Sequence, residues 1–94
     1  MSDKKKQREI QLAAALQYEG TGTPTVVAKG QGEVAARIEA IARRHDVPLV
    51  KDAVLTGLLA NVPLGEEIPE SLFVAVAEVL VHIYRVGDSL DSYQ

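Results

Sequence analysis

The stretch TVVAKGQGEVAARIEAIARRHDVPLV, residues 25–50, decides the predicted fold. It opens with residues 26–28, a short apolar run rich in β-branched side chains, which is typical of a buried strand. Two glycines, Gly30 and Gly32, then allow a sharp turn into a helix. From Glu33 onward, apolar residues recur at helical spacing on one face. The predicted buried face comprises Val34, Ile38, Ile41, Ala42 and His45.

The residues that follow predict the end of this helix and a second strand. Asp46 and Pro48 should stop the helix, because a residue before proline is pushed out of the α region. Leu49 and Val50 then resume the apolar pattern of a buried strand. Strand, helix and strand in this order form a βαβ unit, whose crossover is almost always right-handed.

Outside this stretch, we expect one further strand and a short helix. Residues 11–18 are predicted to be a strand, joined to the Val26 strand through a hairpin-type connection, although the alanines alone favour a helix. Asp52 suits the N-cap of a short helix. The apolar stripe of that helix comprises Val54, Leu55, Leu58, Leu59 and Val62. Gly57 indicates close packing against a neighbour, since glycine otherwise weakens a helix by about 1 kcal/mol relative to alanine.

Pro69 suits the first turn of a last helix. Its apolar residues wrap most of its circumference, so it should lie against the sheet with Glu78 outward. The predicted fold is therefore α/β: a small mixed sheet of three strands, a hairpin plus a βαβ unit, packed against three helices. We expect a domain over residues 10–86, a flexible basic tail at residues 1–9 and a flexible polar tail at residues 87–94.

Composition limits the possible functions. The chain has 94 residues and a formal net charge of -3, which argues against a general nucleic-acid binder. Residues 1–9 do not form a secretory signal; a basic arm that contacts anionic lipid headgroups is an alternative to a solvated tail. The longest apolar stretch, residues 72–84, is interrupted by Glu78 and His82 and is too short to span a bilayer. We therefore expect a cytoplasmic protein with no membrane span of its own.

The sequence contains no recognisable catalytic constellation. Cysteine is absent, and His45 and His82 lie on separate predicted helices, whereas zinc sites normally need three or four ligands. The glycines at residues 20–22 and 30–32 leave phosphate binding open, but turn formation explains them better because a dinucleotide fingerprint needs a third glycine. We expect no enzymatic activity, no metal and no cofactor.

Five short motifs follow one another along the chain: AALQY at residues 14–18, VVAKG at 26–30, HDVP at 45–48, GEEIPE at 65–70 and AVAEVL at 75–80. In order and spacing they resemble the cytoplasmic C-terminal domain of the FlhB/YscU family. That family belongs to the flagellar and type III secretion export apparatus, where it acts as a substrate-specificity switch. The resemblance implies a small α/β domain and covers nearly the whole of the predicted one.

The family's proteins carry membrane helices and cleave themselves within an Asn-Pro-Thr-His sequence, through attack by the asparagine side chain. Those positions fall on residues 8–11, Arg-Glu-Ile-Gln, so we expect no self-cleavage. The membrane helices and the strand before the cleavage site are missing as well. The chain thus resembles the downstream fragment, made as a separate small protein. Ala53 and Val54 replace the prolines usual before the second helix, which leaves the conformation of that loop open.

The resemblance implies a non-enzymatic interaction module that stands in for, or competes with, the downstream fragment of FlhB. Its implied partners are the export-gate membrane proteins, including a FlhB-type membrane subunit, export substrates, and the hook-length or needle-length ruler protein. Its implied location is the cytoplasm or the periphery of the inner-membrane export apparatus. Two alternatives stay open: a regulator or adaptor that does not touch the export gate, and a small α/β domain that binds a phosphate ligand.

Flagellar members of the family also have a shallow hydrophobic pocket for a short apolar signal in early export substrates. By resemblance, its positions here are Thr23, Pro24, Ala77 and Leu80. Thr23 stands where alanine is usual and adds a hydroxyl group. Ala77 and Leu80 lie three apart on one helix face, so the small alanine leaves a depression beside the leucine. Alternatively, these four residues simply pack the hairpin loop against the last helix.

Overall fold

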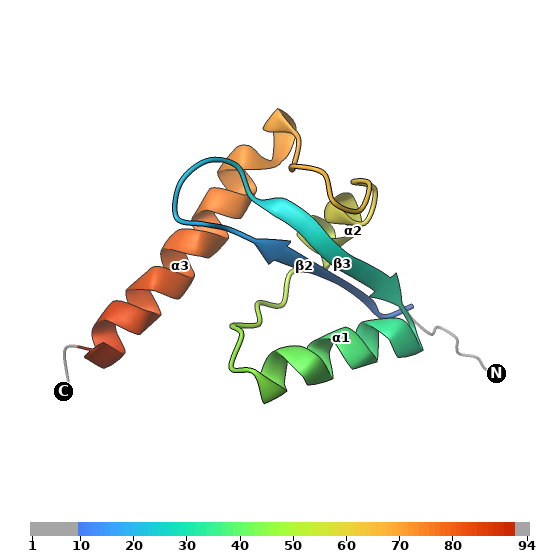
Figure 1. Cartoon of the computed structure of the whole chain (residues 1–94), viewed down its shortest axis with the longest axis horizontal. Helices are drawn as coiled ribbons and strands as arrows, with labels where there is room; N and C mark the ends of the chain where they lie inside the picture. Colours follow the sequence, from blue (N-terminus) through green and yellow to red (C-terminus); the bar gives the residue numbers. More distant parts are fainter. Residues whose placement is uncertain (1–9, 92–94) are drawn as a thin grey trace.

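The computed structural model of the chain describes residues 10–91, with side chains described as far as residue 85. The strands β2 (Leu12–Gln17) and β3 (Thr25–Gln31) precede α1 (Glu33–Arg44) and α2 (Ala53–Leu59), and the 3-10 helix η1 (Glu70–Leu72) leads into α3 (Phe73–Asp91). Figure 1 shows the hairpin of β2 and β3 between α1 on one side and α2 and α3 on the other. The predicted tail at residues 1–9 lies outside the described residues, and α3 extends into the segment predicted as a C-terminal tail.

A β-bulge sets the two faces of the hairpin. Ala15 lies opposite Ala28, but Leu16 lies opposite Val26. Val27 is therefore an extra residue on β3, and it is exposed. A bulge interrupts the alternation of side chains between the two faces of a strand. As a result, residues on the two sides of the bulge face the same helix although they are three positions apart.

Lys29 shows this effect of the bulge. Its side chain points to the same side as Val26, and its ammonium group donates to the carbonyl oxygens of Ala60 at 3.0 Å and Val62 at 2.6 Å. These carbonyls lie just beyond the C-terminus of α2, where intrahelical partners are lacking and a cation is favoured. Lys29 thus ties β3 to the end of α2.

The main core lies between the hairpin, α2 and the start of α3. It comprises Val26, Leu55, Leu59, Val62, Ile68, Leu72 and Val76. Asp52 caps α2 as predicted, since its carboxylate accepts from the Leu55 N–H at 3.0 Å. The predicted α2 stripe is only partly right, because Val54 and Leu58 are 76% and 47% exposed. The prediction for Gly57 was wrong: no atom lies within 4 Å of a Cβ built there.

On the opposite face of the hairpin, α1 packs through small residues. Ala35 is fully buried and Ala13 nearly so, whereas Val34 and Ile41 are each 45% exposed. The sequence predicts Val34, Ile41 and His45 to lie on the buried face; this was wrong for Ile41 and His45, which are exposed, and only partly right for Val34, which covers Gly30 at the margin of the contact. The alanine-rich surfaces of the strands let the helix approach closely, so a small residue occupies the centre of the contact. Gly30 permits this approach from within β3 rather than from the predicted turn, since its Cβ would lie 2.8 Å from the Cβ of Val34.

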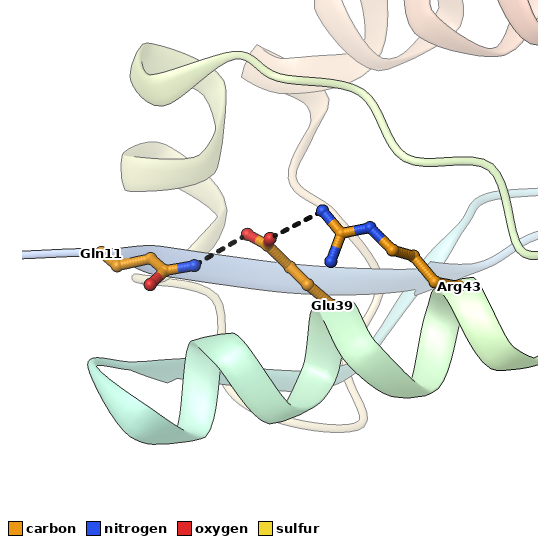
Figure 2. Close-up of polar contacts among 3 residues, drawn as sticks. All are labelled: Gln11, Glu39 and Arg43. Carbon is orange, nitrogen blue, oxygen red and sulfur yellow. Dashed lines mark hydrogen bonds and ion pairs between the residues drawn. The ribbon is translucent and has the colours of Figure 1, made fainter.

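A polar link on the surface joins the start of the hairpin to α1. Figure 2 shows Gln11 Nε2 donating to Glu39 Oε2 at 3.1 Å, while Arg43 Nη2 lies 3.5 Å from Glu39 Oε1. Glu39 and Arg43 form an i,i+4 pair on α1. Because the Arg43 side chain is 60% exposed, such a pair contributes at most about 1 kcal/mol. Apolar packing, rather than this link, therefore positions α1.

The predicted βαβ unit is not formed, and the predicted strand at Leu49 and Val50 was wrong. α1 ends in a left-handed turn, with Asp46 at φ 59° and the Val47 N–H donating to the Ala42 carbonyl at 2.8 Å. Leu49 and Val50 lie in the irregular connection that follows, each 41% exposed. The described sheet has only β2 and β3. A strand needs a neighbour for its backbone groups, and without one this short apolar run stays hydrated.

A different segment lies beside β3. The Val26 N–H donates to the Glu66 carbonyl at 3.0 Å, and the Gly65 N–H donates to the Val26 carbonyl at 2.7 Å. The Ile68 N–H completes the contact by donating to the Pro24 carbonyl at 3.0 Å. These bonds cover the start of the outer edge of β3. Within the described residues, no strand covers the outer edge of β2.

Candidate peptide-binding pocket

The four residues predicted to bind an apolar export signal line a single pocket. Thr23, Pro24, Ala77 and Leu80 border an open depression of about 200 Å³. The first two belong to the loop that leads into β3, and the other two belong to α3, which lies beside that loop (Figure 1). The fold therefore brings together residues that are far apart in the sequence.

The other walls of this pocket were not predicted from the sequence. They are formed by Tyr18, Gly22, Ile68, Phe73 and Val76. Phe73 could have been identified from helical spacing, since it lies four residues before Ala77 and seven before Leu80 on one helix face. No sequence pattern identifies Ile68, because its position depends on the backbone hydrogen bonds between its segment and the start of β3.

Backbone geometry holds the loop side of the pocket in place. Gly22 has φ 78°, a left-handed conformation that glycine adopts without strain, and it turns the chain back toward β3. Pro24 is buried, and its carbonyl accepts from the Ile68 N–H. On the helix side, the Leu72 N–H donates to the Pro69 carbonyl at 2.9 Å and begins η1. Pro69 thus occupies the start of the last helical segment, as predicted.

The chemistry of the pocket is that of an apolar recognition site. Its only side chains with polar atoms are those of Tyr18 and Thr23, and none of its residues is charged. Its volume is below the roughly 300–1,000 Å³ of sites for drug-sized molecules. Leu80 also packs against the main core, whereas Ala77 is exposed. The pocket can hold one or two apolar side chains, and no charged group or histidine lies beside the hydroxyl groups of Tyr18 and Thr23 in its lining.

Other kinds of site receive no support from the described part of the chain. It contains no group of three His, Cys, Asp or Glu side chains that could hold a metal ion. The glycines at residues 20–22 and 30–32 lie at opposite ends of β3, so they do not form one phosphate cradle. Glu33 also places negative charge in the first turn of α1, where a phosphate would bind.

The lengths of the helices give one further limit. No helix between residues 10 and 91 is both long enough and apolar enough to cross a bilayer.

Relatives of the chain cover it to different extents. The chain is 35% identical over 88 residues to YlqH of Bacillus subtilis (strain 168). The aligned region covers 92% of this chain and 95% of YlqH. It is 44% identical over 64 residues to the flagellar biosynthetic protein FlhB of Borreliella burgdorferi. That aligned region covers 67% of this chain. The match spans only 17% of that FlhB.

The fold itself matches a known domain. The crystal structure of the PscU C-terminal domain superposes with a TM-score of 0.72 at 30% identity, covering 78% of this chain and 96% of that domain. The sequence profile of the FlhB HrpN YscU SpaS family matches residues 10–83, most of the chain. The chain belongs to the FlhB HrpN YscU SpaS family.

Proposed function

We propose that the chain is an interaction module of a flagellar or type III export apparatus. It takes the place of the downstream cytoplasmic fragment of a FlhB-type membrane subunit, or competes with that fragment. Family membership supports this role, because matched relatives are flagellar FlhB proteins. The observation that carries the mechanism is the outer edge of β2, which bears no strand within the described residues. Unpaired N–H and C=O groups at such an edge are a template for another strand.

The surroundings of the β2 edge suit an added strand. α1 and α2 lie on opposite faces of the hairpin, and the connection between them passes on the β2 side (Figure 1). Leu12 on β2 and Leu49 and Val50 in that connection expose apolar side chains. An inserted strand would pair its backbone with β2 and bury apolar side chains against these residues. Both contributions are typical of strand addition to a sheet edge.

The occupant that we propose for this edge is a strand of a truncated FlhB-type membrane subunit. In the family, the strand before the cleavage site pairs in the same sheet as the strand after it. A two-stranded hairpin is marginal by itself, so a third strand should stabilise the chain. The chain would then reside at the cytoplasmic side of the export apparatus, attached through its partner.

The pocket supplies a second proposed contact, with export substrates. Its apolar, uncharged wall suits a short apolar signal rather than a charged one. The ruler protein is the other proposed export partner. The hydroxyl group of Thr23 reduces the apolar fit relative to alanine, so we expect weaker binding than in family members that have alanine there.

A strand peptide tests the docking mechanism. The purified chain is titrated with a peptide that carries the strand before the cleavage site of a FlhB-type subunit. We expect a higher melting temperature, because a ligand that binds only the folded state stabilises it. Amide exchange should slow along Leu12–Gln17. The control is the same peptide with a central proline, which cannot continue a ladder. A chain that stays monomeric at millimolar concentration and binds neither peptide would refute the mechanism.

Two neighbouring residues of α3 test the pocket. Leu80 lines the pocket and also packs against the core, whereas Val79 packs against the core without lining the pocket. Leu80→Ala should abolish binding of an export-signal peptide at a stability cost below the roughly 2–5 kcal/mol of a fully buried leucine. Val79→Ala should lower the melting temperature and leave peptide binding intact. Lost stability with unchanged binding in Leu80→Ala would mean that these residues only pack the loop against the helix.

A further inference from the structure

A second groove lies where the end of α2 meets η1. It is open, has a volume of about 320 Å³, and is called here the acidic groove. Its lining includes Leu58, Val62, Pro63, Glu66, Glu67 and Leu72. Both glutamates are exposed, and no basic side chain is among the lining residues. Leu64, next to the groove in sequence, is also exposed. The groove therefore combines exposed apolar side chains with negative charge.

The outer face of α1 carries the complementary chemistry. Val34, Arg37, Ile41 and Arg44 are all exposed and are spaced at i, i+3, i+7 and i+10, so they form one line along the helix. We call these four residues the basic stripe. Ala35 occupies the centre of the contact between α1 and the hairpin, so Ile41 is left exposed, whereas Val34 is as exposed but also touches Gly30 of β3. The stripe therefore presents an apolar side chain between two arginines.

We propose that the acidic groove of one copy receives the basic stripe of a second copy of this chain. Ile41 enters the apolar part of the groove, and Arg37 and Arg44 face Glu66 and Glu67. At 1.5 Å per residue, the two arginines stand about 10 Å apart along α1, so they can reach acidic groups on both sides of a central apolar contact. The opposite charges of the two surfaces select this pairing over a pairing of like surfaces.

The position of the two surfaces makes the contact head-to-tail. Figure 1 shows α1 on one side of the hairpin and the segment from α2 to η1 on the other. One copy therefore cannot bring its own stripe to its own groove. In a head-to-tail contact each added copy leaves one groove and one stripe free, so assembly does not stop at a dimer unless the rotation closes a ring. Since exposed ion pairs are screened by salt, the association should be weak and salt-sensitive.

Charge reversal provides the test. Sedimentation velocity is measured over a protein concentration series at ionic strengths of about 0.01 M and 1 M, where the Debye length is roughly 30 Å and 3 Å. The variants are Glu66→Lys with Glu67→Lys, and Arg37→Glu with Arg44→Glu. The matched control for the first is Glu19→Lys with Glu78→Lys, which makes the same charge change at exposed sites outside the groove. Thermal melting confirms that each variant is folded.

We expect the wild type and the control to associate at low ionic strength and to dissociate at high ionic strength. Each reversed variant alone should associate at least about tenfold more weakly, since two ion pairs become repulsive contacts. An equal mixture of the two reversed variants should associate again, because the lysines introduced into the groove of one variant then face the glutamates introduced into the stripe of the other.

Three results would overturn the proposal. The first is a wild type that stays monomeric at millimolar concentration and low ionic strength. The second is association of the groove variant as strong as that of the control, which would assign self-association to the free β2 edge instead. The third is a mixture of two folded reversed variants that remains monomeric. None of these results by itself refutes strand docking at β2, which the peptide titration tests separately.

Discussion

Gly30→Ala should destabilise the fold, although alanine is ordinarily the better residue in a strand interior. A Cβ added at Gly30 would lie 2.8 Å from the Cβ of Val34 and would also contact its Cγ1. Carbon atoms in contact prefer about 3.5–4.0 Å. Rotation about χ1 cannot move the Cβ of Val34, so the first turn of α1 must shift away from β3. Overpacking of this kind costs about 1–3 kcal/mol, which lowers the melting temperature of a small domain by roughly 4–8 °C per kcal/mol.

Urea denaturation followed by circular dichroism measures the effect, and two comparisons isolate its cause. Gly57→Ala is the matched control: Gly57 lies in α2 with nothing within 4 Å of the added Cβ. That substitution should stabilise the chain by about 0.5–1 kcal/mol, because glycine is the weaker helix former. The second comparison repeats Gly30→Ala in a Val34→Gly background, where the colliding side chain is gone. There the cost should fall by more than about 0.5 kcal/mol, the scale of coupling between contacting residues. An unchanged cost in that background, or a neutral Gly30→Ala, would refute close approach as the reason for this glycine.

Three further predictions concern single contacts or short motifs. Lys29→Met removes the hydrogen bonds to the Ala60 and Val62 carbonyls and should lower the free energy of unfolding by about 1.5–3 kcal/mol in denaturation experiments. The control Lys51→Met, at an exposed site, should stay within about 0.5 kcal/mol of wild type. Equal effects of the two substitutions would contradict the role of Lys29. Asp46→Gly should stabilise the chain by about 1 kcal/mol, since Asp46 has φ 59° and left-handed backbone is unfavourable for residues with a Cβ; a loss of stability would contradict this. Mass spectrometry after incubation at neutral to alkaline pH should show an intact chain, because residues 8–11 lack the cyclising asparagine; a clean break between Arg8 and Glu9 would disprove it.

Features that depend on local chemistry were predictable from the sequence. The strand β3, the extent of α1 and the Asp52 cap all rest on short-range patterns: a β-branched apolar run, the helical period, and a side chain that accepts from the N–H three residues later. The strand β2 was predicted from the hairpin-type connection that follows it, although its alanines alone favour a helix. The left-handed turn after α1 was predicted as a helix end, although not as a residue with positive φ. In each case, the residues that decide the structure lie within about one helical turn of one another, so the pattern is visible in a short window.

Features that depend on a neighbour were not predictable. Leu49 and Val50 have the composition of a strand, but pairing requires a partner edge that the described chain does not bring to them. Val34 and Ile41 are more hydrophobic than Ala35, yet size decided which residue lies at the centre of the contact with an alanine-rich sheet. Gly30 and Gly57 look alike in the sequence, and only the structure shows which of them has a close neighbour.

The residues of the candidate pocket also differ in whether the sequence alone could have identified them. Thr23, Pro24, Ala77 and Leu80 were identified through resemblance to a family rather than through any local pattern. Phe73 could have been added from helical spacing. Ile68 could not, because the hydrogen bond from its N–H to the Pro24 carbonyl joins segments more than forty residues apart in sequence.

The bulge at Val27 links the end of α2, the segment beside β3 and the loop side of the pocket through one series of contacts. It directs Lys29 to the end of α2, and Lys29 fixes the start of the segment that pairs with the outer edge of β3. That pairing holds Ile68 against Pro24 and so builds the loop side of the pocket. The outer edge of β2 takes no part in this chain of contacts. A strand bound at β2 and an apolar peptide bound in the pocket would therefore occupy separate places on the hairpin, and the two proposed contacts do not exclude each other.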